Sequence, residues 1–423
     1  MRKSFVIVLC LLASAVSSSA QTFQSGYFLD GYSYGYRINP AIHDQRGFLG
    51  LAVGDAQVGM ASQMPFSTFF QTLSNGEMVP FWDDSADDRK VMSSLKGQTR
   101  LDLDIHESVL ALGFRGKNAY NTLELNVRGF ASANAADGVI GFMLAHSGDD
   151  KNSVYDMSNS DLKIQSFYEL AYGHSHQFGD KLTLGLRVKF LAGLESLNAE
   201  TGRLYRDHGE IVPPCDGHMA VSYKNLGIPT AGESVEFLDV LEMEEFTPAP
   251  NGFGGSVDLG LTYEPVKGLV VSASVLDLGG VSWKNHIYGH IDPDPKDDIH
   301  FIQEGVKSTF ESLPLTVTAG ARYSIPHFSW LTPGVLYTHR SYNGMSTYTM
   351  KAGLTVSAKD WASINANFGS STYGPTWGGA FRFRLGFISL HAGLEGFMNA
   401  DENPFRTSAF AGLNLVFGKG REK

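Results

Sequence analysis

The stretch "KLTLGLRVKFLAG", residues 181–193, decides the fold class because apolar and polar residues alternate along it. Leucine, valine and phenylalanine occupy the even positions from 182 to 190, and Gly185, Arg187 and Lys189 are among the residues between them. A β-strand with this period has one apolar face and one polar face. A strand of about ten such residues is long enough to cross a bilayer as part of a barrel.

The same alternation recurs through the rest of the chain. It is found in "NTLELNVRGFA" (121–131), "GSVDLGLTYEP" (255–265), "PLTVTAGARYS" (314–324), "AFRFRLG" (380–386) and "LNLVFG" (413–418). A soluble β-sandwich would also alternate in this way. Two features favour a membrane barrel: the apolar faces end in Tyr or Phe, and the connections alternate between short and long.

Threading the chain on this rule predicts an all-β fold, a transmembrane antiparallel β-barrel of about fourteen strands with both ends in the periplasm. The predicted strands are 47–59, 99–116, 119–131, 162–178, 182–194, 253–264, 269–282, 313–325, 329–341, 346–357, 361–370, 377–385, 387–397 and 405–417. The second of them changes phase, since its apolar residues are odd-numbered up to Ile105 and even-numbered from Leu110. We therefore expect a bulge near Glu107 and Ser108.

Composition indicates export to the outer membrane of a Gram-negative cell. Residues 1–20 combine Arg2 and Lys3, a short apolar run and small residues, as a secretory signal peptide does. The net charge of −11 argues against a nucleic-acid partner. No later apolar run reaches 18 residues, so no helical span is expected.

The segment "SGYFLDGYSYGYRINPA", residues 25–41, has neither a helical stripe nor strand alternation. A fourteen-stranded barrel encloses a lumen that wall side chains do not fill, and irregular backbone at membrane depth must lie inside protein. We expect residues 21–46 to plug the barrel formed by 47–423, whereas a periplasmic or disordered tail is the alternative. The predicted plug residues are Tyr27, Phe28, Tyr32, Tyr34, Tyr36, Asn39 and Pro40.

An aromatic segment that ends in Asn-Pro-Ala before the first strand resembles the FadL-like outer-membrane barrels and their PorV-like relatives. The stretches 167–194 and 252–283 and the ending "FAGLNLVFGK" look similar too, most of all to an uncharacterised group of such barrels typical of Bacteroidota. The resemblance implies an N-terminal hatch and passive uptake of a small hydrophobic ligand. A PorV-like role would instead make the barrel an anchor for secretion or surface-complex proteins.

Charged residues of both signs fall on the predicted lumen face, which indicates an ion-pair network rather than a selectivity ring. They are Asp102, Asp104, Glu124, Arg128, Glu169, Arg187, Lys189, Asp258, Arg322, Arg382, Arg384 and Glu395. Four aromatic residues of the 60–98 connection are candidates for an apolar ligand site, with simple loop packing as the alternative. They are Phe66, Phe69, Phe70 and Trp82.

The sequence does not indicate an enzyme, a metal site or a cofactor. His174 and His176 share one strand face but lack a nearby third ligand. Asp102, Asp104 and His106 share another face, yet no motif marks a nucleophilic serine to accompany them. For an outer-membrane barrel the expected partners are the lipid bilayer and lipopolysaccharide. A hydrophobic small molecule or secretion and surface-complex proteins are further possibilities.

Overall fold

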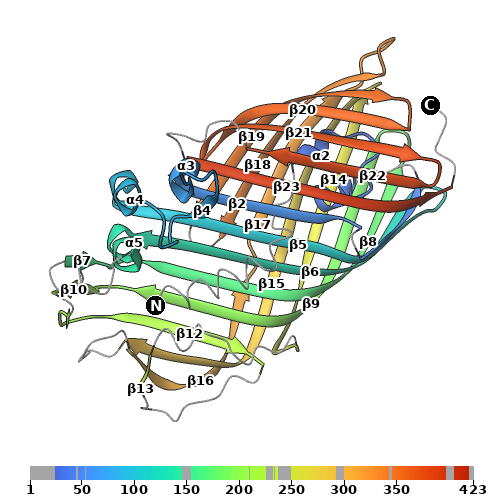
Figure 1. Cartoon of the computed structure of the whole chain (residues 1–423). Helices are drawn as coiled ribbons and strands as arrows, with labels where there is room; N and C mark the ends of the chain where they lie inside the picture. Colours follow the sequence, from blue (N-terminus) through green and yellow to red (C-terminus); the bar gives the residue numbers. More distant parts are fainter. Residues whose placement is uncertain are drawn as a thin grey trace.

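The computed structural model describes residues 24–43, 46–52, 54–144, 154–208, 210–224, 232, 234–236, 249–291, 300–342, 345–396 and 404–418. Its strands form one closed antiparallel barrel of fourteen strands, as predicted (Figure 1). The predicted signal peptide, residues 1–20, lies outside the described residues.

The ring closes because β23 pairs with the first strand, which is interrupted and consists of β1 and β2. In ring order the strands are β1 (Gly47–Leu51) with β2 (Ala56–Pro65), β5 (Gln98–Arg115), β6 (Ala119–Ala136), β8 (Asp161–Phe178), β9 (Leu182–Thr201), β14 (Gly252–Val266), β15 (Leu269–Ile291), β17 (Leu315–Tyr323), β18 (Leu331–Tyr342), β19 (Met345–Ala358), β20 (Ala362–Ser371), β21 (Gly374–Leu385), β22 (Ile388–Glu395) and β23 (Pro404–Phe417).

Strand β5 contains the expected bulge. The pairing of β5 with β6 shifts between Ser108 and Leu110, so Val109 is the extra residue. The Val109 carbonyl instead accepts a hydrogen bond from the Ala52 N–H, and the Ser108 N–H donates to the Asp55 carbonyl. The break between β1 and β2 was not predicted, and it faces this bulge across the sheet.

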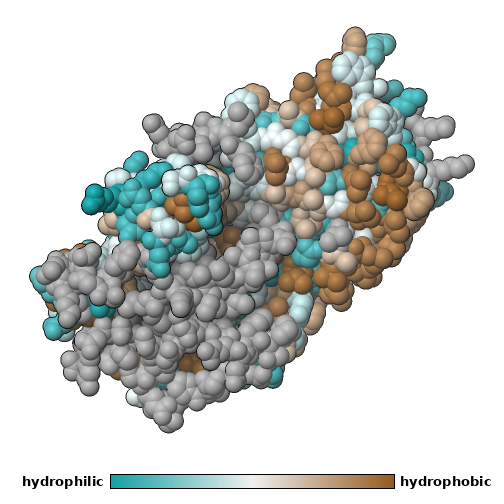
Figure 2. Space-filling view, viewed as in Figure 1, coloured by the Kyte–Doolittle hydropathy of each residue, from teal (hydrophilic) through white to brown (hydrophobic). Residues whose placement is uncertain are grey.

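The outer surface of the barrel is apolar, as a bilayer requires. Large apolar side chains such as Leu186, Phe190 and Ile364 are exposed there, and Figure 2 shows such side chains gathered away from the end that carries the helices. Exposed aromatic residues also mark several of the short turns, among them Trp330 and Trp361. This arrangement resembles the aromatic girdle of membrane barrels.

At the end of the barrel opposite these short turns, strands extend beyond the fourteen-stranded ring. The connections predicted as long loops contain strands: β12 (Gly217–Tyr223) pairs with β9 and β15, β16 (His300–Ser312) with β15, and β13 (Ser234–Glu236) with β16. A small sheet of β7 (Val154–Asp156), β10 (Tyr205–Asp207) and β11 (Glu210–Ile211) lies apart from the ring. Residues outside a bilayer need not alternate between apolar and polar, so the alternation rule did not predict these strands.

Helices are few and short. A cap is formed by α3 (Phe66–Phe69), β3 (Phe70–Thr72), β4 (Met78–Pro80), α4 (Asp88–Ser94) and α5 (Asp137–Leu144), and Figure 1 shows its helices at one end of the barrel. The N-terminal segment contributes α2 (Ser25–Phe28) and the 3-10 turn η1 (Gly35–Arg37). No helix in the described ranges is both long enough and apolar enough to span a membrane.

Candidate functional site

Residues 24–43 lie inside the ring and contact strands on all its sides. All seven predicted plug residues belong to this segment, and Phe28 and Tyr34 have no exposed surface. Its side-chain hydrogen bonds with the wall join Ser25 to Glu395 (2.7 Å), Tyr27 to Ser272 (3.0 Å), Tyr34 to Asn414 (2.8 Å), Tyr36 to Glu124 (2.7 Å) and Asn39 to the carbonyls of Leu261 (3.1 Å) and Ala273 (2.9 Å). The tyrosine hydroxyl groups thereby satisfy polar groups of the inner wall.

Two glycines make room for Asn39 and Pro40. Gly185 of β9 and Gly260 of β14 are paired neighbours in the sheet. A Cβ atom at Gly185 would lie 2.2 Å from the Pro40 carbonyl carbon, and one at Gly260 would lie 2.2 Å from Asn39 Oδ1. Any side chain at these two positions would displace the segment from the wall.

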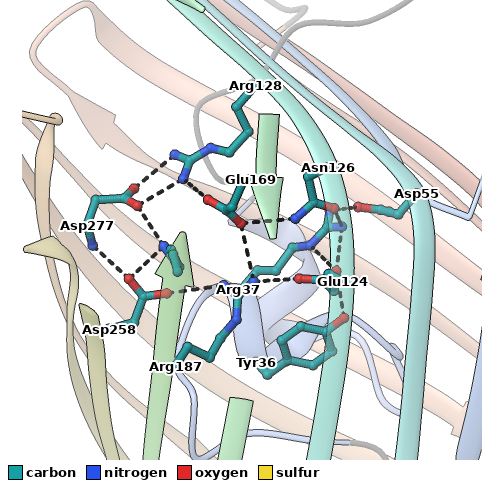
Figure 3. A network of polar contacts seen from close by, with 11 residues as sticks. Tyr36, Arg37, Asp55, Glu124, Asn126, Arg128, Glu169, Arg187, Asp258 and Asp277 are labelled. Atoms are coloured by element: carbon teal, nitrogen blue, oxygen red, sulfur yellow. Dashed lines mark hydrogen bonds and ion pairs between the residues drawn. The ribbon is translucent and has the colours of Figure 1, made fainter. Parts of the chain in front are cut away.

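Arg37 joins the segment to a buried network of charges (Figure 3). Its guanidinium group lies 2.8 Å from Asp55 Oδ2 and 2.7 Å from Glu124 Oε1. Neither carboxylate has any exposed surface. Because a buried charge is costly unless it is paired and hydrogen-bonded, these three side chains depend on one another.

The network continues along the inner wall. Arg187 bridges Glu124 (2.5 Å) and Asp258 (3.1 Å), and Lys189 bridges Asp258 (2.7 Å) and Asp277 (2.6 Å). Arg128 completes it by bonding Glu169 (2.7 Å) and Asp277 (2.9 Å). Six of the twelve predicted lumen charges therefore meet here, namely Glu124, Arg128, Glu169, Arg187, Lys189 and Asp258.

Asp55 and Asp277 reach the network because the strands are irregular where they lie. Asp55 sits at the break between β1 and β2 and also bonds Tyr32 (3.0 Å) and His391 (2.7 Å). Around Asp277 the pairing of β14 with β15 shifts, and the residue has a φ of 62°. Simple alternation places Asp277 on the lipid face, so sequence reasoning missed both residues.

The other six predicted charges lie in separate clusters rather than in one network. Towards the end that carries the helices, Asp102 pairs with Arg100 (2.8 Å), and Asp104 pairs with Arg340. Glu395 pairs with Lys351 beside α2. Near the short turns Arg322 bonds Asp30 (2.5 Å), Arg384 bonds Asp360 (2.7 Å), and Arg382 donates to the Asp360 carbonyl (3.0 Å).

Above the network, apolar side chains meet across the lumen. Phe130 of β6 and Tyr342 of β18 lie on strands that are not neighbours in the ring, yet their ring centroids are 5.1 Å apart. They belong to a buried cluster with Phe167, Leu191, Val281, Trp283 and Leu313. Two polar cavities between the described wall residues measure only about 20 Å³ each, which is room for about one water molecule.

The four residues predicted as a ligand site are brought together in the cap. Phe69 packs on Phe70 (4.9 Å between centroids) and Trp82 (5.5 Å), and Phe66 packs on Phe70 (5.2 Å). The cluster also includes Val91 of α4, which has no exposed surface. The rings thus form a small core for the cap, and contact with a ligand stays a prediction.

A wider cavity of about 580 Å³ lies on the lipid-facing side of the wall. Its floor includes the small residues Ala352, Ala366 and Gly379, and Phe368 and Trp377 stand at its rim. The ladders from β19 to β22 run across it without a register shift. We interpret it as part of the surface that contacts lipid. Among the described residues no group of three or more His, Cys, Asp or Glu is placed to hold a metal ion.

Comparison with known proteins identifies the family. A family model described as a family of unknown function, DUF5723, matches residues 40–292. The chain belongs to the DUF5723 family. This confirms the expected kinship with an uncharacterised barrel family, and no curated protein matches this DUF5723 chain.

Solved structures similar to this DUF5723 protein include hydrocarbon channels and a FadL homologue. A deltaS2S3 mutant of the TodX monoaromatic hydrocarbon channel is 9% identical, with 95% of this chain and 98% of that one covered and a TM-score of 0.50. The toluene transporter TbuX of Ralstonia pickettii is 11% identical (90% and 92% covered, TM-score 0.47), and a Pseudomonas aeruginosa FadL homologue is 9% identical (95% and 99%, 0.45). At such identities the likeness concerns the fold alone, which is a β-barrel like that of the TodX channel.

Proposed function

We propose that this DUF5723 protein is an outer-membrane channel that residues 24–43 keep closed, and that a small hydrophobic molecule passes when this plug moves. The observation that carries the proposal is the burial of the plug against strands on all sides of the ring, with Arg37 paired to Asp55 and Glu124. Such a plug blocks the lumen but is held by polar contacts that can be exchanged. In this proposal residues 1–20 direct export and residues 21–46 form the hatch.

The nature of the cargo is inferred from two supports. The similar structure is named a monoaromatic hydrocarbon channel, and the inner wall beyond the network carries Phe130, Phe167 and Trp283. An apolar lining with few polar groups suits an apolar ligand. The cap rings Phe69 and Trp82 would then lie where such a molecule arrives from outside.

A second candidate is a barrel that does not transport and anchors a secretion or surface complex. The observation that favours it is the contact of Phe130 with Tyr342 across the lumen, which does not involve the plug. The wall extension of β12, β13 and β16 would then offer the docking surface.

Releasing the plug distinguishes the two candidates. The double variant Gly185→Ala/Gly260→Ala places two methyl groups against the backbone and side chain of Asn39 and Pro40. Gly129→Ala is the matched control, because a Cβ atom there meets nothing closer than 3.6 Å. The plug state is read from tryptic cleavage after Arg37, which is 4% exposed in the native protein. Transport is read from conductance in planar bilayers and from uptake of N-phenyl-1-naphthylamine, a hydrophobic probe, by cells.

For a channel, we expect the double variant to be cleaved at Arg37, to conduct and to take up the probe faster, while the native protein and Gly129→Ala resist cleavage, do not conduct and take up the probe slowly. A double variant that is cleaved but neither conducts nor speeds uptake would remove the channel and leave the anchor. A disulfide lock provides the reverse test. Ser25 Oγ lies 3.0 Å from the place of a Cβ at Gly378, so oxidised Ser25→Cys/Gly378→Cys in a Cys215→Ser background should stop the uptake that its reduced form allows.

A further inference from the structure

A polar cavity of about 20 Å³ lies beside Gln24, at the start of the plug. It is lined by two arginines, Arg340 and Arg406, by Gln24, and by four threonines that include Thr338 and Thr349. These side chains come from β17, β18, β19, β23 and the plug. The cavity therefore lies where the plug meets strands from two parts of the chain.

The charges around this cavity do not balance. Three nearby cations have carboxylate partners, since Arg100 pairs with Asp102, Arg340 with Asp104 and Lys351 with Glu395. Arg406 is the fourth cation. Within the described ranges it has no carboxylate within ion-pair distance, and it donates a hydrogen bond to the hydroxyl of Thr349. Arg406 therefore has N–H donors that no carboxylate of the described residues accepts.

Two buried polar atoms on the same walls also lack partners. Gln24 is 3% exposed and its Oε1 makes no hydrogen bond, and Thr338 is 8% exposed and its Oγ1 makes none. A hydroxyl group can rotate to donate its proton. The amide of Gln24 can turn to place its N–H₂ where Oε1 now lies, since the two orientations differ little in shape. Both groups can therefore donate into the cavity beside Arg406.

We propose that this cavity binds one small monovalent anion of about the size of chloride. The volume admits a single water-sized particle, so polyatomic anions and larger ligands are too big. A water molecule would fit as well, but an anion would in addition pair with Arg406, which has no carboxylate within ion-pair distance among the described residues. A halide accepts hydrogen bonds from the guanidinium, the hydroxyl groups and the amide together. The anion would connect Gln24 to the wall and fasten the start of the plug, whether or not the barrel transports.

Bromide tests the site directly, because its anomalous scattering distinguishes it from water. Crystals of the full chain grown in sodium bromide should show an anomalous peak within hydrogen-bond distance of the Arg406 guanidinium. Arg406→Gln should lose the peak entirely. Arg100→Gln, which removes a cation that already has a carboxylate partner, should keep it. Thr338→Val is a second, nearly isosteric variant, and it should lower the peak to half or less.

Each other outcome overturns the proposal. Native crystals with a water molecule at this place and no bromide signal would show that the cavity is merely hydrated. A peak of equal height in Arg406→Gln would mean an adventitious ion only. If Arg406→Gln does not fold, Thr338→Val decides, and an unchanged peak in that variant counts against the site.

Discussion

At the scale of single residues, Arg37 carries ion pairs that join residues 24–43 to the barrel wall. Arg37→Met removes the guanidinium group but keeps most of the volume, and it leaves Glu124 with Arg187 alone, and Asp55 with His391 alone, as an ion-pair partner. Removing one partner of a buried pair typically costs about 3–5 kcal/mol. We expect the variant to lose its compact, heat-modifiable band on gels at a clearly lower temperature than the native protein.

Two further variants show whether charge is the cause. Arg89→Met changes an exposed arginine of α4 and should leave the transition unchanged. Adding Glu124→Gln to Arg37→Met removes one of the two carboxylates that Arg37 pairs with. This should restore part of the lost stability, because the effects of mutations at contacting residues are not additive. An equal or greater loss in the double variant would contradict the charge argument.

The residues of the lumen were predictable only where the strands are regular. Glu124, Arg187 and Asp258 alternate cleanly with leucine and valine, so their inward direction follows from the period of a strand. Asp277 has the parity of the lipid face, and a shift in strand pairing turns it inward. Arg37 lies in a segment without any period. Which charged residues pair with Arg37 depends on how the ring closes, because these partners are distant from Arg37 in the sequence.

At the scale of elements, the bulge in β5 decides which face of that strand meets lipid. Deleting Val109 would join the two halves in one phase and turn Asp102 and Asp104 outward, because a slip of one residue exchanges the two faces. Carboxylates on the lipid face oppose insertion. We expect the deletion to abolish the heat-modifiable folded band, whereas Val109→Ala, which keeps the residue count, should assemble normally. A folded band of native intensity in the deletion would mean that β5 can shift its register against both neighbours.

Strand positions were largely predictable, since each of the fourteen ring strands falls within a few residues of its predicted range except where strands run on outside the ring. The bilayer imposes alternation on the part of a strand that crosses it. It imposes nothing on the outer ends of β9 and β15, which continue to Thr201 and Ile291 and pair with β12. Length and pairing there are set by contacts between loops. Alternation alone carries no information about them.

At the scale of the whole molecule, the apolar cluster of the cap is distinct from the charge network of the lumen, although it also includes Phe405 of β23 and Met64 of β2. The cap packs Phe69, which is 2% exposed, against Phe81 and Trp82 at 5.2 and 5.5 Å, and the lumen packs around Arg37. Phe69→Ala should lower the free energy of unfolding of the cap by about 3–5 kcal/mol. So small a core should not stay folded after such a loss. We therefore expect rapid tryptic cleavage after Arg89 and Lys90, while the gel transition of the barrel stays at the native temperature. Phe310→Ala, at a residue that is 67% exposed, is the matched control and should change neither readout. A barrel that melts together with the cap would show that the two ends form one cooperative unit, in which case the cap would help to hold the plug closed.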